Sequence, residues 1–213
     1  MHNLFLKAAD VLSNALLQVH QAAKEYEEIQ KAGETAEELV LPVKLQIVQS
    51  TYKLFRELKA FDQVYRYNTY RKQYDIAPTF RFVAEETYLY GDGKISLGAN
   101  SYIGRYSSIQ AVEGCRVEIG KNCRISHFVK IYTMNTEADQ DFSAPELVKR
   151  KGDVIIGDYC WIGAGALIRE GVTIGDNCVI GANSVVTQDV PSYSIVAGNP
   201  AKIVKKKSCA PNA

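Results

Sequence analysis

The chain has 213 residues, of which 46% are apolar and 23% charged, a composition ordinary for a folded globular protein. Its 25 lysines and arginines nearly balance its 24 aspartates and glutamates, so the net charge is +1. This balance gives no electrostatic reason to expect nucleic acid or an anionic membrane as the main partner. No stretch approaches the ~20 apolar residues of a membrane-spanning helix. The five cysteines lack metal-type spacing, so we expect reduced thiols and a cytoplasmic location.

Residues 1–76 have the apolar periodicity of α-helices. Apolar side chains recur at steps of three and four residues in two runs, which predicts one buried face on each of two helices. The first run comprises Leu12, Ala15, Leu16, Val19, Ala22, Ala23, Tyr26 and Ile29, and the second comprises Leu45, Val48, Tyr52, Phe55, Leu58 and Phe61. A short turn near Gly33 would join the helices. We assign residues 1–76 to an N-terminal helical region.

From residue 91 a six-residue repeat replaces the helical pattern. An aliphatic residue is followed by a small one at Leu97–Gly98, Ile103–Gly104, Ile119–Gly120, Ile125–Ser126, Ile156–Gly157, Ile162–Gly163, Ile174–Gly175 and Ile180–Gly181. Four residues after each aliphatic position stands a small or β-branched residue, such as Ser101, Cys123 or Val172. A chain that turns a corner every six residues forms a three-sided coil of about eighteen residues. The aliphatic and the small side chains would both point into that coil.

This pattern resembles that of the hexapeptide-repeat acyltransferase family, whose fold is a left-handed parallel β-helix. The resemblance covers about residues 89–205. It implies a mainly β protein, with a β-helix domain over residues 77–205 and a C-terminal tail over residues 206–213. One interruption of the repeat lies between Ile109 and Ile119, and a longer one forms a loop over residues 133–154. In this family such a loop projects from the β-helix and helps to cover the acyl acceptor.

His127 is the candidate general base. It stands two residues after Ile125, an offset that points away from the packed interior, and imidazole suits proton transfer at neutral pH. Related enzymes that acetylate serine, or amino groups of nucleotide sugars, carry their base at this offset. The resemblance implies that His127 deprotonates an acceptor hydroxyl or amine, which then attacks the thioester of acetyl-CoA. Backbone N–H groups of a neighbouring coil would stabilise the oxyanion.

A carboxylate could orient the imidazole of His127 by accepting its second N–H. The candidates, among which the sequence does not choose, are Glu113, Glu137, Asp139 and Asp141. Many sugar acetyltransferases of the family read Met-Asn-His in the loop, whereas this chain reads Met134-Asn135-Thr136. The resemblance places three residues beside the acceptor, namely Tyr132, Asn135 and Thr136.

Acetyl-CoA needs an elongated groove and cations for its phosphates. By resemblance, small corner residues of the later coils and the single tryptophan line this groove: Trp161, Gly163, Ala164, Gly165, Gly181 and Ala182. By the same resemblance Thr187 contacts the donor, although the following residue, Gln188, stands where relatives often have a lysine. The segment Ala197–Lys202 closely matches the terminal motif of the family, and Lys202 could meet a phosphate as a point charge.

We interpret the chain as an acetyl-CoA-dependent O-acetyltransferase that acts on a sugar hydroxyl of surface-polysaccharide type. The family assembles as trimers with active sites at subunit boundaries, so we expect a homotrimer. An N-acetyltransferase of an amino nucleotide sugar, a xenobiotic O-acetyltransferase and a non-catalytic β-helix scaffold remain alternatives. A zinc enzyme on this fold needs three histidines, and the repeat region holds only His127, so we expect no metal. Three cysteines fall on inward positions, which favours direct transfer over an acyl-cysteine intermediate.

Overall fold

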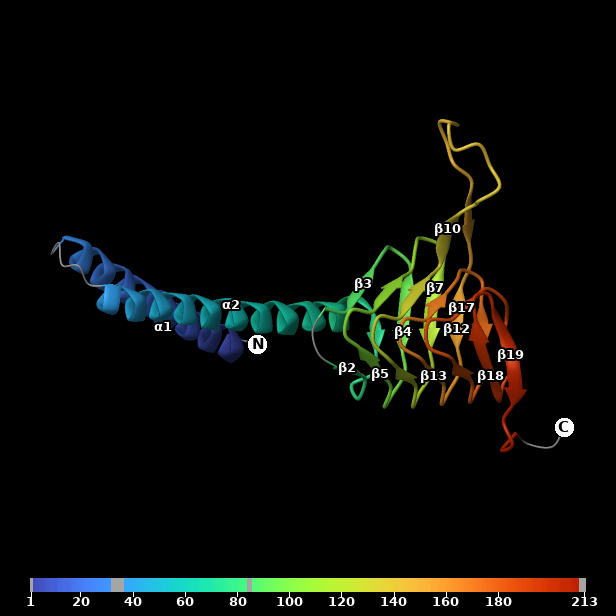
Figure 1. Cartoon of the computed structure of the whole chain (residues 1–213). Coiled ribbons are helices and arrows are strands. Elements are labelled where there is room, and N and C mark those ends of the chain that lie inside the picture. Colours follow the sequence, from blue (N-terminus) through green and yellow to red (C-terminus); the bar gives the residue numbers. More distant parts are fainter. Residues whose placement is uncertain (1, 32–36, 84–85, 211–213) are drawn as a thin grey trace. The chain divides into compact units, whose positions relative to one another are not determined.

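The computed structural model describes residues 2–31, 37–83 and 86–210, and the chain divides into two units between Arg66 and Tyr67. The first unit contains helix α1 (His2–Lys31) and most of helix α2 (Glu37–Gln73), which lie side by side (Figure 1). Ala15 and Ala22, seven residues apart, are buried on one face of α1. The turn expected near Gly33 falls outside the described residues. Among the helices described, none has an apolar stretch long enough to cross a membrane.

The second apolar run is not buried as its periodicity predicted. Five of its six members are exposed on α2, namely Leu45, Val48, Tyr52, Phe55 and Leu58. A helix turns by about 100° per residue, which places Leu45, Val48, Tyr52 and Phe55 on the side opposite the half-buried Leu54 and Phe61. Helical periodicity therefore predicted the helix but not which of its sides is buried, and Phe61 does not share a side with the first four residues of the run.

The second unit is a parallel β-helix built from three sheets (Figure 1). Sheet A contains β1 (Asp75–Ile76), β4 (Lys94–Leu97), β7 (Arg116–Ile119), β12 (Val154–Ile156) and β15 (Thr173–Ile174). Sheet B contains β2 (Arg81–Val83), β5 (Tyr102–Gly104), β8 (Arg124–Ile125), β13 (Trp161–Ile162), β16 (Val179–Ile180), β18 (Ser194–Gly198) and β19 (Ala201–Lys206). Sheet C contains β3 (Tyr88–Tyr90), β6 (Ser108–Gln110), β9 (Lys130–Tyr132), β14 (Leu167–Ile168) and β17 (Val185–Val186).

The chain passes from sheet A to sheet B to sheet C and back in every coil, so three edges run along the β-helix. We name each edge after the sheets it joins. The A–B corner comprises residues 98–101, 120–123, 157–160 and 175–178. The B–C corner comprises residues 105–107, 126–129, 163–166 and 181–184. The C–A corner comprises residues 91–93, 111–115, 133–153, 169–172 and 187–189.

The interior is a stack of the repeat's aliphatic residues. Ile103, Ile125, Ile162 and Ile180 are at most 1% exposed, and they succeed one another on sheet B. The small residues four places on are also buried: Ser101, Ser107, Cys123, Val129, Cys160, Ala166, Val172, Cys178, Ser184 and Val190. Burial of both positions in the uninterrupted hexads confirms the parallel β-helix that the sequence predicts. Each coil pairs its backbone with the coils on either side, so the coils stabilise one another.

Two hairpins depart from the parallel coils. Strands β10 (Met134–Thr136) and β11 (Lys149–Lys151) pair antiparallel and carry the long loop, which extends away from the β-helix at the C–A corner (Figure 1). At the C-terminal end, β19 folds back antiparallel on β18, so that Lys202 lies opposite Ala197. The turn of this second hairpin lies above the B–C corner, because the Gly198 N–H donates to Ser184 Oγ at 3.1 Å.

Candidate active site

His127 occupies the B–C corner directly after strand β8, and its side chain is exposed. The backbone of this corner is tied to both neighbouring coils. The Phe128 N–H donates to the Arg105 carbonyl at 3.0 Å, and the His127 carbonyl accepts from the Gly165 N–H at 2.9 Å. The imidazole is therefore presented to solvent from a backbone that is held on both sides.

Gly104 provides the space for the imidazole on the preceding coil. A Cβ atom at Gly104 would lie 2.5 Å from His127 Nδ1 and 2.8 Å from the carbonyl carbon of Ser126. Both separations are far inside van der Waals contact, so only glycine fits here without movement of the corner. The histidine ring thus lies over bare backbone of the coil below.

Most of the residues predicted to bind the donor continue the same edge toward the C-terminus. Gly163, Ala164 and Gly165 form the next step of the B–C corner, and Gly181 and Ala182 the one after it. The steps are in close contact, since the Asn183 N–H donates to the Ala164 carbonyl at 2.8 Å. Within the described part of the chain, the backbone N–H groups of Ala164 and Ala182 make no hydrogen bond. This edge therefore offers unpaired backbone N–H groups, which can donate hydrogen bonds, beside small side chains.

The remaining predicted donor residues divide between this edge and another. Trp161 on β13 is 53% exposed, and its indole N–H lies 3.4 Å from Ser126 Oγ, next to His127. Lys202 is on β19, in the hairpin that lies above the same corner. Thr187 lies apart, at the C–A corner, where it lines a cavity of about 310 Å³ with Arg150, Lys151, Arg169 and Glu170.

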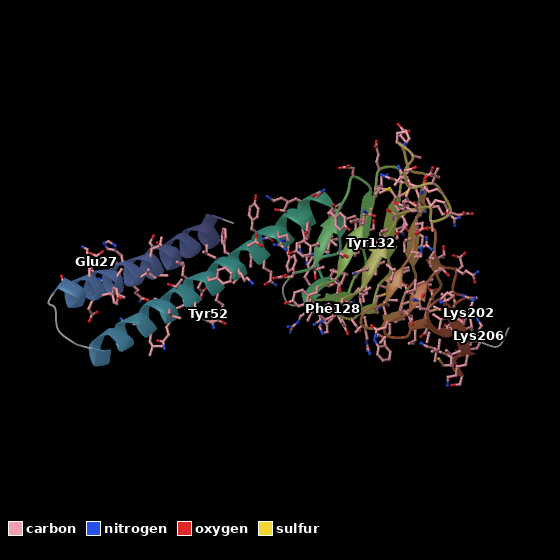
Figure 2. All side chains as sticks on the ribbon, turned by 45° about the horizontal axis from the view of Figure 1, so that its top comes forward. Glu27, Tyr52, Phe128, Tyr132, Lys202 and Lys206 are labelled. Carbon is pink, nitrogen blue, oxygen red and sulfur yellow. The ribbon has the colours of Figure 1, made fainter. Side chains whose placement is uncertain are left out.

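The predicted acceptor residues and carboxylates lie in the C–A corner or, for Tyr132, at the end of the strand that leads into it, and not beside His127. Figure 2 shows Tyr132, the last residue of β9, apart from Phe128 of the B–C corner. The Tyr132 hydroxyl lies 3.3 Å from Ser108 Oγ, and Asn135 donates to Glu170. Thr136 is on β10, Glu113 is in the corner preceding β7, and Asp139 is in the long loop. Among the described residues, no hydrogen bond joins His127 to a carboxylate, so one chain does not bring the predicted halves of the site together.

The carboxylates of the loop are engaged locally. Glu137 pairs with Arg150 across the hairpin. Desolvation raises the pKa of Glu137, but the hydrogen bonds from Arg150 and from the N–H groups of Asp139 and Ala138, with the charge of Arg150, together outweigh it, so this pKa lies below its ordinary value. Asp141 accepts hydrogen bonds from the N–H and the hydroxyl of Ser143, which also lower its pKa. Both groups are thus anionic at neutral pH and stiffen the hairpin.

Comparison with known proteins identifies the repeat. The family described as bacterial transferase hexapeptide (six repeats) matches residues 153–188. A Dictyostelium discoideum protein named as an acetyltransferase is 40% identical over 131 residues, which are 60% of this chain and 68% of that protein. The chain belongs to the hexapeptide-repeat acyltransferase family. This membership confirms the resemblance drawn from the repeated aliphatic–glycine pairs.

Two further proteins similar to this member of the hexapeptide-repeat family are informative. The polysialic acid O-acetyltransferase of Escherichia coli O1:K1 is 40% identical over 121 residues, which are 54% of this chain and 39% of that protein. A hexapeptide-repeat-containing acetyltransferase of Vibrio cholerae O1 biovar eltor, solved in complex with acetyl-CoA, is 28% identical. It superposes with a TM-score of 0.55, covering 67% of this chain and 76% of that one. The chain therefore spans well under half of the Escherichia coli relative and about two thirds of the Dictyostelium one.

The cysteines of this family member form a buried ladder. The thiols of Cys123, Cys160 and Cys178 donate to carbonyls of the next coil at 3.1–3.2 Å, and none is more than 1% exposed. Hydrogen bonds shared with Cys123 and Cys178, together with burial, raise the pKa of the Cys160 thiol. Cys115 is half-buried and Cys209 is exposed.

This burial predicts a defined pattern of thiol reactivity. In the native protein we expect an aromatic disulfide reagent to modify Cys209 rapidly and Cys115 more slowly, because the thiolate must be reachable to react. The three ladder thiols should react only after unfolding. Counting modified thiols against time, with and without denaturant, measures this. The fast phase should vanish in Cys209→Ser, and rapid modification of any ladder cysteine would contradict the prediction.

Sequence reasoning missed two features of the His127 corner. It did not find the contact of His127 with Gly104, although Gly104 precedes His127 by one coil and belongs to a recognised aliphatic–glycine pair. It also missed an aromatic pair, Tyr106 and Phe128, whose rings stack with centroids 5.1 Å apart and an interplanar angle of 14°. The only signal was that each stands three residues after the aliphatic residue of its hexad, at the same corner of successive coils.

Proposed function

We propose that the protein transfers an acetyl group from acetyl-CoA to a sugar hydroxyl, with His127 as the general base. The observation that carries this proposal is the B–C corner. There an exposed histidine on a restrained backbone is followed, coil by coil, by small residues with unpaired N–H groups. The acetyl-CoA complex of the Vibrio cholerae relative supports the donor. The name of the Escherichia coli relative supports a glycan hydroxyl as the acceptor.

In the proposed reaction His127 accepts the proton of the acceptor hydroxyl while the oxygen attacks the thioester carbonyl. The resulting tetrahedral oxyanion is stabilised by a backbone N–H of the corner, for which the unpaired groups of Ala164 and Ala182 are candidates. Collapse of this intermediate breaks the carbon–sulfur bond, and the imidazolium returns its proton to the departing thiolate of CoA. No protein nucleophile is consumed, in agreement with the burial of the cysteine ladder.

The location of the acceptor loop supports a site shared between copies. The loop of residues 133–153 and the carboxylates near it belong to the C–A corner, whereas His127 belongs to the B–C corner. A neighbouring copy that sets its C–A corner against this B–C corner completes the site, and repeating the contact around a threefold axis closes a homotrimer. Light scattering should then give three times the chain mass, and a monomeric mass would count against this assembly.

The function is tested by measuring thiol release from acetyl-CoA with a panel of candidate acceptors. The panel contains sugars, oligosaccharides of sialic acid, amino nucleotide sugars and aminoglycosides, and calorimetry with CoA serves as an independent measure of donor binding. We expect CoA to bind and a hydroxyl-bearing sugar to give the fastest release. Preference for an amino nucleotide sugar would assign N-acetylation instead. A protein that binds no CoA would be a scaffold, and the enzyme proposal would fall.

A further inference from the structure

The aromatic pair at the His127 corner is exposed. Tyr106 is 47% exposed and Phe128, the residue after His127, is 54% exposed. Their rings are nearly parallel, and together they present a flat apolar surface along the B–C corner, with Phe128 labelled in Figure 2. Exposed aromatic rings that stack on one another still leave their outer faces to solvent. Such a surface is unfavourable in water unless something covers it.

The backbone of both aromatic residues is also unfavourable. Tyr106 has a φ of 57° and Phe128 a φ of 60°, in the left-handed region that bulky side chains rarely adopt. The same turn position in the next two coils is occupied by Gly165 and Asn183, which tolerate this conformation. A residue kept in a disfavoured conformation where a tolerant one would fold better points to a functional requirement.

The A–B corner provides a comparison. Tyr159 has a φ of 59° and is 56% exposed, but the coil after it has Asn177 at the same turn position. Left-handed tyrosines therefore occur elsewhere in this protein as single residues. Among the described corners, only the B–C corner stacks two aromatic rings on consecutive coils, and it does so beside His127.

The direction of the edge determines what these rings can contact. The residues proposed to hold the donor, from Gly163 to Lys202, lie on the C-terminal side of His127. In direct transfer the acceptor must reach the same carbonyl carbon as the base without displacing the donor. The free side is the N-terminal one, over the coil of Tyr106, and the aromatic pair forms that surface.

We propose that Tyr106 and Phe128 form the acceptor platform of the site, on which the apolar face of a pyranose ring stacks. This inference rests on the proposed acetyl transfer and adds a class of acceptor to it. The face of an aromatic ring carries negative charge density, and the axial C–H groups of a pyranose present weakly positive hydrogens to it. Stacking holds the sugar ring flat against the edge and presents a ring hydroxyl to His127.

The matched test replaces each aromatic residue by asparagine, the residue that this protein itself uses at the same turn position. Tyr106→Asn and Phe128→Asn keep a side chain that tolerates the left-handed backbone, so folding is preserved. Tyr159→Asn, at the other corner, removes an equally exposed aromatic ring from an equivalent turn and serves as the control. The probe is the methyl pyranoside of the best monosaccharide acceptor found in the screen. The measurements are its KM, the affinity for CoA by calorimetry, and the mass by light scattering.

We expect each platform variant to raise the KM for the pyranoside about 10-fold, the loss typical of one aromatic stacking contact, with CoA affinity and mass unchanged. Tyr159→Asn should behave as wild type. An unchanged KM in both platform variants overturns the inference while leaving acetyl transfer intact. A fall in CoA affinity would show that the rings bind the acetyl donor, and a fall in mass would show that they form contacts between copies. Either result overturns the platform. Failure of the wild-type protein to acetylate any acceptor refutes the proposed function, and the platform with it.

Discussion

Replacing His127 by alanine is expected to lower acetyl transfer at saturating substrates by about 100-fold or more, the contribution of a positioned general base. The side chain is exposed at a corner and lies over Gly104, so its removal leaves no cavity in the core. Folding and CoA affinity should therefore be retained. The rate is measured as thiol release from acetyl-CoA with the acceptor identified by the screen.

His20→Ala is the matched control for this experiment. His20 is exposed on helix α1, in the other unit of the chain, and its loss should not change the rate. If His127→Ala retained more than a tenth of the wild-type rate, His127 would not be the base, and the acceptor would have to lose its proton to another group or to water. A variant that lost CoA binding as well would indicate a role in holding the donor.

The second large effect is expected at Gly104, which contributes no functional group. Its replacement by alanine places a methyl group within 2.5 Å of His127 Nδ1 and 2.8 Å of the Ser126 carbonyl carbon. The imidazole and the backbone that carries it must both move. Because a displacement of about 1 Å at a reacting group can cost about 100-fold, we expect Gly104→Ala to reduce kcat by that order. Steady-state kinetics with the same acceptor measures the loss.

Gly98→Ala separates displacement of His127 from a general loss of packing. Gly98 is in the same coil, one corner earlier, and a Cβ there would lie 2.4 Å from the Gly120 carbonyl carbon. Both substitutions should lower the denaturation midpoint to a similar extent. Only Gly104→Ala should lower kcat in the fraction that stays folded. Equal kcat in the two variants would show that the position of His127 over Gly104 does not govern the reaction.

The β-helix could be predicted from the sequence because its rule is local. Each hexad specifies which side chains point inward, and the burial of Ile162 and Cys160 follows from their place in one hexad. The exposed stripe on α2 shows the limit of such a rule. Periodicity indicates that Val48 and Phe55 share a face of the helix. Whether another surface covers that face depends on contacts with residues distant in the sequence, which a short stretch of sequence does not reveal.

The site was predictable only in part, for a geometric reason. The offset of His127 within its hexad indicates an outward side chain, and the structure has it exposed. Counting one further hexad from His127 places residue 133 at the next corner of the coil. Asn135, two residues later, therefore cannot lie on the same edge of the β-helix as His127 of the same chain. The stacking of Tyr106 on Phe128 is harder to foresee, because aromatic residues are poor candidates for left-handed turns.

The terminal hairpin has a consequence for how copies of this protein meet. A parallel β-helix ends in strands whose N–H and C=O groups are free to pair with another chain, which favours end-to-end stacking into fibres. On sheet B that last strand is β19, which runs antiparallel to the coils and carries Lys202, Lys205 and Lys206 on an exposed edge. A second copy arriving end-on would meet the wrong strand direction for continuing the coil and a row of like charges. The hairpin thus restricts growth along the helix axis and leaves the three lateral faces for association.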